Sequence, residues 1–248
     1  DNALTLNDIF THLYRTGALM ASYDCLPVKS LRLYAEFEYA YTSMNGRNIH
    51  DFLPRAMIEW HPDAEALLSL RYDKLLVRPS LQYLNPAEIR EPLAIRSGNG
   101  DIVGMHLHKV SFDFGWKFPS LSAHLNASYL YTKDGFNAIW MERGNIRIYK
   151  WGNEGVRHAV SITPSLKMKA SGTTDINASV SALWDKRIAE SINLSNDNWG
   201  VAAHVDLNQR LPAGFRLNVH GDVSYGSTLD LYRRADLAYN FGGRIERS

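Results

Sequence analysis

Polar side chains two residues apart are the parts of this sequence that could do chemistry, because on a β-strand such pairs share one face. His106 and His108 would offer two imidazoles to a metal ion, but they share the parity of an apolar row, so we expect a rim position and no metal site. Ser122 and His124 form no arrangement that would activate a nucleophile. We therefore expect no catalytic residue, no metal site and no cofactor, and predict that the protein is not an enzyme.

A second set of polar side chains is expected to line an interior wall in contact with water. Each of its members lies at a polar position of a segment in which polar and apolar residues alternate: His124, Asn126, His204, Asp206, Arg216 and His220. These side chains either contact a ligand or a neighbouring domain, or simply supply the polar surface of a solvated interior. Four residues of a long connecting segment could meet an anionic or glycan ligand, although a solvated loop would also explain them: Arg78, Tyr83, Arg90 and Arg96.

Composition narrows the classes of protein that can carry these residues. The chain has 248 residues and a formal net charge of +1, so no strongly basic surface favours nucleic acid. Cys25 is the only cysteine, which excludes an intrachain disulfide. No run of about 18 apolar residues is present, which argues against a membrane-spanning helix. A membrane β-barrel stays compatible with the mean hydropathy of −0.28, because its polar interior keeps that average low.

Alternation with a period of two predicts the elements that position these side chains. In residues 31–42, for example, aliphatic and aromatic side chains alternate with Arg32, Glu36 and Glu38. Similar rows recur along the chain, end in Tyr, Trp or Phe, and run about 10 to 15 residues, where strands of soluble sandwiches average about 5 to 6. These features favour an all-β fold, an antiparallel transmembrane β-barrel, over a soluble sandwich.

Eleven strands are expected from this alternation. They cover residues 11–24, 30–42, 51–60, 66–78, 102–117, 121–141, 146–169, 175–190, 198–209, 215–225 and 229–241. Short links alternate with longer connections at 42–53, 78–104, 142–155 and 190–198, as short periplasmic turns alternate with long extracellular loops in outer-membrane barrels. Because bacterial barrels usually close with an even number of strands, either residues 2–8 add a twelfth strand or the chain is part of a larger barrel.

Five short motifs follow one another in an order that resembles the C-terminal barrel portion of TonB-dependent outer-membrane receptors, in the β-barrel family common in Bacteroidetes. They are LNDIFTHLYRTGALMASY at 6–23, LRLYAEFEYAYT at 31–42, FLPRAMIEW at 52–60, VRPSLQYLNP at 77–86 and SGNGDI at 97–102. The segment LAYNFGG at 237–243 resembles the terminal strand of that family. Gly100 departs from the pattern, because the family favours proline there.

The resemblance implies a barrel of about 22 strands in the outer membrane of a Gram-negative bacterium. It also implies TonB-driven uptake of a bulky nutrient, such as a siderophore, glycan or peptide. The implied partners are outer-membrane lipid, the receptor's own plug domain, the TonB energy-coupling system and a surface lipoprotein, and no nucleic acid. We expect residues 1–248 to be the C-terminal portion of the barrel without its plug. Two alternatives stay open, a stand-alone passive pore and a receptor-like scaffold that holds surface partners.

Overall fold

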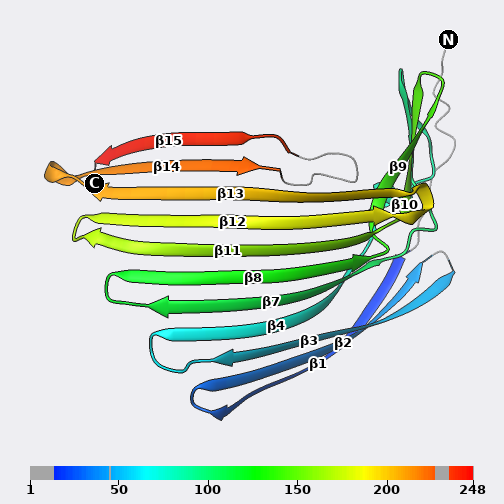
Figure 1. Ribbon diagram of the computed structural model, residues 1–248. Helices are drawn as coiled ribbons and strands as arrows, with labels where there is room; N and C mark the ends of the chain where they lie inside the picture. The colour runs from blue at the N-terminus through cyan, green and yellow to red at the C-terminus, as the bar shows by residue number, and fades with distance from the viewer. Residues whose placement is uncertain (1–13, 45, 227–234, 248) are drawn as a thin grey trace.

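One large antiparallel sheet dominates the computed structural model, which describes residues 14–44, 46–226 and 235–247 (Figure 1). It contains eleven strands, the number predicted, and each strand pairs with its neighbours in chain order. The last strand begins and ends later than the predicted 229–241, and the predicted segments 2–8, 11–13 and 229–234 lie outside the described residues. The strands are β1 (Tyr14–Val28), β2 (Leu31–Met44), β3 (Arg47–Trp60), β4 (Ala66–Val77), β7 (Met105–Lys117), β8 (Leu121–Lys133), β11 (Val156–Ser171), β12 (Thr174–Ala189), β13 (Leu194–Arg210), β14 (Phe215–Tyr225) and β15 (Ala238–Arg247).

A second sheet of four short strands stands at one end of the large sheet (Figure 1). Its order is β5 (Ile89–Glu91), β6 (Ala94–Ser97), β10 (Ile146–Asn153) and β9 (Phe136–Arg143), with β6 and β10 parallel. A single helical turn, α1 (Leu81–Leu84), precedes β5. Short 3₁₀ turns η1 (Glu190–Ile192) and η2 (Pro212–Gly214) lie between strands of the large sheet.

No helix in the described part of the chain is long and apolar enough to cross a membrane.

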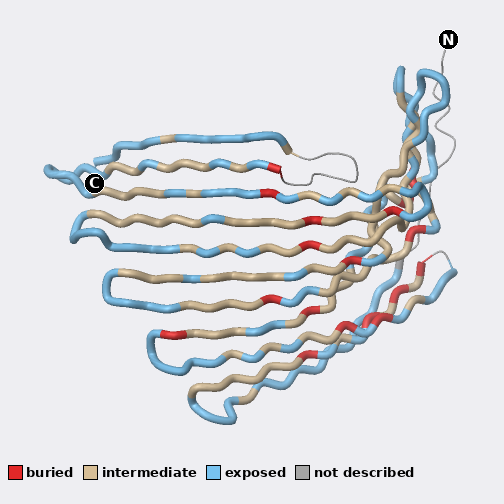
Figure 2. The backbone as a smooth tube through the Cα atoms, viewed as in Figure 1, coloured by how far each residue is buried: buried red, intermediate tan, exposed pale blue. Residues whose placement is uncertain are grey.

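The large sheet has two chemically different faces, because successive residues of a strand point to opposite sides. The outer face exposes large apolar side chains such as Phe37, Ile58 and Leu70, each about half exposed. The inner face carries polar residues, among them Glu36 and Asp185, which are buried. Most other residues of the large sheet are intermediate or exposed (Figure 2). An exposed apolar face opposite a polar one is the pattern of a membrane barrel wall, in which lipid covers the outside and water the inside.

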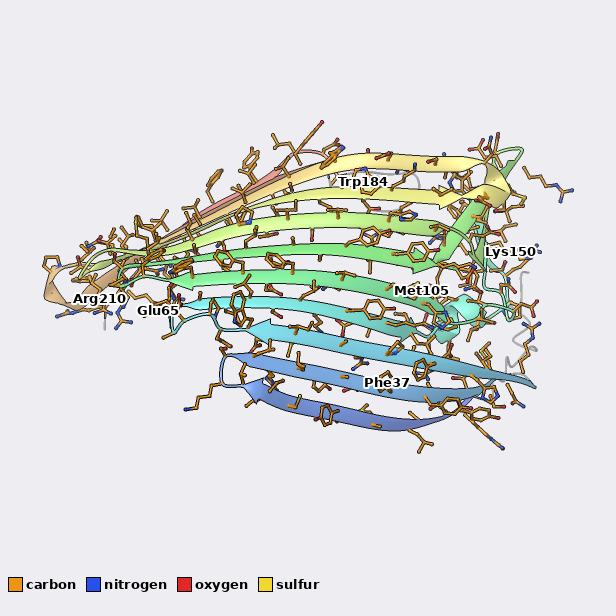
Figure 3. All side chains as sticks on the ribbon, turned by 60° about the horizontal axis from the view of Figure 1, so that its bottom comes forward. Phe37, Glu65, Met105, Lys150, Trp184 and Arg210 are labelled. Atoms are coloured by element: carbon orange, nitrogen blue, oxygen red, sulfur yellow. The ribbon has the colours of Figure 1, made fainter. Side chains whose placement is uncertain are left out.

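The two ends of the sheet differ in their connections. Short turns join the strands at the end that carries Glu65 and Arg210, whereas Met105 and Lys150 mark the end with the small sheet (Figure 3). We take the second end as extracellular, because outer-membrane barrels place their longer loops there. Two of the predicted loops, 42–53 and 190–198, are wrong: β3 begins at Arg47, soon after β2 ends, and β13 begins at Leu194. The polar residues of these two segments belong largely to strands, so the polar composition of the segments was a wrong indication of loops.

Two predicted strands, 121–141 and 146–169, are each broken in two. Asp134 and Gly155 adopt positive φ values of 58° and 105°, and these residues separate β8 from β9 and β10 from β11. Left-handed backbone cannot continue a strand, so the chain leaves the large sheet and forms the β9–β10 hairpin. The periodicity runs on through both breaks, which is why it predicted continuous strands.

Proline loosens the sheet where β3 meets β4. Their pairing runs from Trp60 opposite Leu68 only to Arg55 opposite Asp73, immediately before Pro54. Proline has no N–H to give to the next strand, so the ladder ends there and the extracellular halves of the two strands separate.

The connection between β4 and β7 folds over the inner face of β2 and β3 beyond that separation. Arg78 donates to Thr42 Oγ1 at 3.4 Å, and His106 Nε2 lies 2.7 Å from Asp51 Oδ1. Met44 at the end of β2 packs against Leu84 and Ile102 of the connection, and Tyr83, Phe136 and Trp151 border this cluster. His106 of β7 has the parity of the apolar row, yet its imidazole contacts the buried carboxylate of Asp51 on β3, beyond the point where β3 and β4 cease to pair.

Candidate functional site

The inner face of β2, β3 and β4 carries a wall of paired charges. Arg55 Nη1 lies 2.8 Å from Glu36 Oε1, and its Nη2 lies 3.6 Å from Glu38 Oε2. On the next strand, Arg71 Nε donates to Asp73 Oδ2 at 2.8 Å. The carboxylates of Glu36 and Asp73 are buried, and this wall is held by opposite charges placed across β2 and β3 and along β4.

Neutral hydroxyls and amides cover the inner face further along the sheet. Ser128 and Ser161 Oγ atoms are 2.8 Å apart on β8 and β11, and Thr163 Oγ1 lies 2.9 Å from Ser181 Oγ on β12. The second contact spans the place where Pro164 interrupts the β11–β12 pairing, so the two hydroxyls replace a missing backbone bond. This region offers hydrogen-bonding groups without a net charge.

The predicted residues His124 and Asn126 meet beside this stretch, around the carboxylate of Asp113 on β7. Asn126 Nδ2 donates to Asp113 Oδ1 at 2.7 Å, and His124 Nε2 lies 3.5 Å from the same oxygen. His124 is exposed on the inner face. The structure therefore brings these two predicted residues together on the inner wall.

His204 and Asp206 form a second predicted cluster, on β13, with Asp222 of β14. The ring nitrogens Nδ1 and Nε2 of His204 lie 2.6 Å from Asp222 Oδ1 and 2.8 Å from Asp206 Oδ2. Asp222 stands opposite His204 in the strand register, so the pairing follows from the alignment of β13 with β14. We call these three residues the His204 cluster; a shallow groove of about 380 Å³ that includes His204 and Asp222 opens beside it.

Arg216 and His220, also predicted, lie on β14 but in different surroundings. His220 is paired with Asp206 in register, and its ring fills the space beside Gly242 of β15, where a Cβ would come within 2.4 Å of the imidazole. Arg216 lies nearer the periplasmic turns, in a groove of about 400 Å³ that also includes Arg210 and Arg244. Asp175 and Glu246 line the same groove, and Arg244 Nη2 lies 2.5 Å from Glu246 Oε1, so Arg216 stands among charges of both signs.

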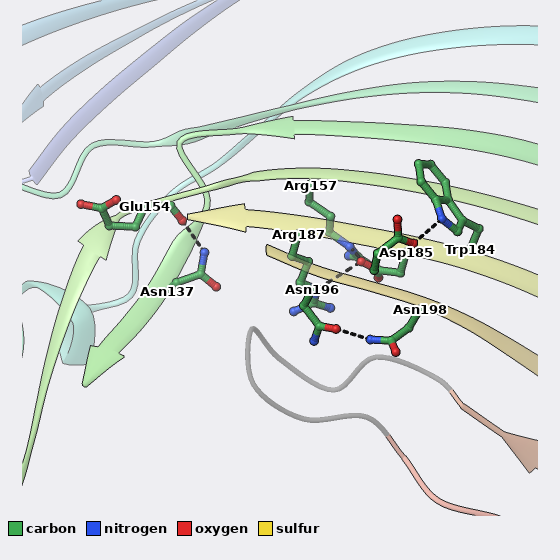
Figure 4. A network of polar contacts seen from close by, with 9 residues as sticks. Asn137, Glu154, Arg157, Trp184, Asp185, Arg187, Asn196 and Asn198 are labelled. Carbon is green, nitrogen blue, oxygen red and sulfur yellow. Dashed lines mark hydrogen bonds and ion pairs between the residues drawn. The ribbon is translucent and has the colours of Figure 1, made fainter. Parts of the chain in front are cut away.

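A buried ionic cluster near the extracellular rim was missed by the sequence analysis. Asp185 of β12 receives hydrogen bonds from Arg157 Nε and Nη2 at 2.9 and 2.5 Å, and Arg187 Nε donates to its other oxygen at 3.2 Å (Figure 4). Asn196 and Asn198 of β13 are hydrogen-bonded to each other beside it. We call Asp185, Arg157 and Arg187 the Asp185 cluster. The alternation in the sequence places all three on the inner face, but it does not show which residues face each other across neighbouring strands.

The small sheet at the extracellular end (β5, β6, β10 and β9), which we call the extracellular sheet, carries part of the predicted set of loop residues. Tyr83 packs against Trp151 with ring centroids 4.2 Å apart, so its ring holds the loop together. The Arg96 guanidinium lies 5.3 Å from the centre of the Tyr149 ring and 3.5 Å from Glu91 Oε1. Arg90 pairs with Glu88 at 2.8 Å, whereas Arg78 contacts Thr42. The structure does not gather the four residues into one site.

A second cation–π pair on the same sheet joins Arg147 of β10 to Trp140 of β9. The Arg147 guanidinium lies 5.3 Å from the centre of the Trp140 ring and 3.4 Å from Glu142 Oε1. Hydrogen bonds to the Tyr149 phenol and to the Glu142 carboxylate raise the pKa of Arg147 above its ordinary value, so this cation stays charged. A shallow depression of about 650 Å³ lies beside these residues on the extracellular sheet.

Among the residues that the structure describes, no three His, Cys, Asp or Glu side chains are grouped to hold a metal ion. His108 packs against Tyr72 and Tyr131 on the outer face, as its parity predicts, while His106 faces Asp51. The two imidazoles therefore serve different contacts.

Comparison with known proteins supports the barrel architecture. The model of the outer membrane protein beta-barrel family matches residues 32–244. Similar solved structures include the FrpB iron transporter from Neisseria meningitidis (11% identity, TM-score 0.65), the copper transporter OprC (9%, 0.72) and the ferric yersiniabactin uptake receptor FyuA from Yersinia pestis (10%, 0.65). They cover 96%, 94% and 94% of this chain, which in turn spans only 39%, 40% and 38% of theirs. No curated protein matches the sequence.

Proposed function

Because this chain belongs to the outer membrane protein beta-barrel family, and so lies in the outer membrane of a Gram-negative bacterium, we propose that it forms part of the barrel wall of a TonB-dependent receptor. The receptor would take up a bulky nutrient, such as a siderophore, glycan or peptide. Its partners would be a plug domain of the same receptor, the TonB energy-coupling system and the surrounding lipid.

The observation that carries this proposal is the open sheet. Within the described residues, β1 pairs only with β2 and β15 only with β14, so the sheet has two unpaired edges. Unpaired backbone N–H and C=O groups in lipid cost several kcal/mol each, by general estimates, so open edges are unfavourable there, and further strands of a longer receptor would pair with both of them. Eleven strands are half of the about 22 strands of plugged outer-membrane transporters, whereas open porins have about 16 to 18.

The chemistry of the inner face fits a lumen that holds another folded domain. Ionic groups such as Glu36 and Arg55 are already paired with each other, and Ser, Thr and Asn side chains cover the stretch between the charged regions. The more accessible groups, including His124 and the His204 cluster, are free to contact a plug or a passing nutrient. The extracellular sheet with Arg96 and Arg147 would meet the nutrient first, as surface loops of rigid scaffolds often do.

The similar solved structures agree with this proposal but do not identify a substrate. The similar structures are described as an iron transporter, a copper transporter and a ferric yersiniabactin uptake receptor. They share the fold with this chain at low identity, so the nutrient class has to be found by experiment.

Uptake in the native bacterium tests the proposal directly. Growth on a panel of ferric siderophores, glycans and peptides would be compared between wild type, a strain that lacks this protein and a strain with TonB disrupted. We expect both mutant strains to lose growth on one and the same nutrient. If instead the purified full-length protein conducts steadily in planar bilayers and small solutes still enter without TonB, it is a passive pore and the proposal is wrong.

A further inference from the structure

Five side chains of the outer face stand in one line across five neighbouring strands near the extracellular end. The strand register pairs Lys74 with His108 and His108 with Tyr131. It continues from Tyr131 to His158 and from His158 to Lys186. We call these five residues the basic row; each is partly exposed.

Hydrogen bonds from tyrosines fix the two imidazoles of the basic row. The Tyr72 hydroxyl lies 2.9 Å from His108 Nδ1, and the Tyr129 hydroxyl 2.8 Å from His158 Nδ1. The Tyr131 ring lies between them, with centroids 5.9 and 5.2 Å from the two imidazoles. With the phenol as donor, Nδ1 is the acceptor and the proton is on Nε2, so each imidazole offers an N–H on the other side of its ring.

The lysines of this region have no anionic partner. Within the described ranges, none of Lys74, Lys186 and Lys133 forms an ion pair; Lys133 has the parity of Tyr131 and follows it by two residues on β8. Asp197 stands opposite Lys186 in register, but its carboxylate accepts a hydrogen bond from Trp184 Nε1 at 2.6 Å. The row therefore presents two unpaired lysines and two fixed N–H donors to the outside, and Lys133 adds a third unpaired cation close to the row.

The depth of the basic row places it at the border between hydrocarbon and head groups. The next row toward the periplasm contains Tyr72, Val110, Tyr129, Val160 and Trp184. Below it, the outer parity of these five strands contains no Lys or Arg down to the periplasmic turns. Aromatic girdles mark the membrane interface of such barrels, so a cationic row directly above the girdle lies among the head groups of the outer leaflet.

We propose that the basic row binds the phosphate groups of lipids in the outer leaflet. Charge complementarity argues for an anionic ligand, because lysines without partners and N–H donors are the groups that hold phosphate. The apolar face directly below argues for a lipid rather than a protein, because a lipid can cover that face with its chains while its phosphate reaches the row. The site depends on the chain's place in the outer membrane and not on what it transports.

Lipid retained on the purified full-length protein tests this site. The protein would be exchanged into nanodiscs that contain either lipid A with both phosphates or the dephosphorylated form, and bound lipid would be counted by native mass spectrometry. The test variant is the triple Lys74→Gln, Lys133→Gln and Lys186→Gln. The matched control is Lys117→Gln, Lys167→Gln and Lys169→Gln, three lysines of the inner parity at the periplasmic end.

We expect the wild type and the control to retain the phosphorylated lipid and to lose the dephosphorylated one. Each lysine near an anionic surface contributes about fivefold in binding, so the test triple should weaken retention on the order of 100-fold. His108→Phe with His158→Phe keeps the ring stacking and should weaken it less. Equal retention by the test triple and wild type, an equal loss in the control triple, or indifference to the phosphates would each overturn the proposal.

Discussion

The Asp185 cluster and the His204 cluster have the same plan but differ in burial. Each places one ionisable group of the inner face between two partners, one on its own strand and one on the neighbouring strand. The central carboxylate of Asp185 is 1% exposed, whereas the imidazole of His204 is 41% exposed. Water screens the second cluster and not the first, so we infer that the Asp185 cluster stabilises the barrel rim and the His204 cluster is available to a ligand or a plug.

Removing the central carboxylate of the buried cluster should give the largest effect. Asp185→Ala leaves Arg157 and Arg187 directly opposite each other in the strand register, with no anion between them. Breaking a buried ion pair from one side costs about 3 to 5 kcal/mol. The free energy of unfolding from urea titrations of the reconstituted protein measures this loss. A change as small as that of Asp222→Asn in the exposed cluster would contradict the structural role.

Removing one cation of the same cluster should cost less. Arg157→Met leaves Asp185 paired with Arg187 Nε at 3.2 Å, so the carboxylate keeps a charged partner. Loss of hydrogen bonds to a charged group costs about 1.5 to 3 kcal/mol. The same urea titration separates this variant from Asp185→Ala. If the two variants lose equal stability, the carboxylate is not shared as the geometry indicates.

The exposed cluster should tolerate substitution with the smallest change in stability. Asp222→Asn removes one carboxylate from His204 while Asp206 remains 2.8 Å away. Exposed ion pairs contribute little, so the unfolding midpoint should not move measurably. Uptake of the nutrient should fall more than stability does. A large loss of stability would show that this cluster, too, is structural.

The alternation of apolar and polar residues predicted most of the fold. In β2, Glu36 and Phe37 lie on the faces that their parity assigns, because lipid outside and water inside impose one rule along the whole strand. The breaks at Asp134 and Gly155 could not be predicted, because each depends on a single backbone angle that leaves the periodicity intact.

The candidate site was predictable only within one strand. His204 and Asp206 were identified because they are two residues apart, whereas Asp222 joins them through the register of β13 with β14. Asp185 and Arg157 are 28 residues apart and meet for the same reason. A single sequence shows the parity of a residue but not which residue faces it across the sheet. The Bacteroidetes type of the family, and every ligand contact of the named residues, stay predictions.

We infer that these eleven strands are half of a larger, plugged barrel. Mass spectrometry of the native protein extracted from outer membranes distinguishes that barrel from a small one. We expect one polypeptide of well over twice 28.1 kDa, because the chain spans only about two-fifths of the transporters it resembles. A native mass of 28.1 kDa would contradict it, because the two sheet edges would then have to close on each other in a small stand-alone barrel.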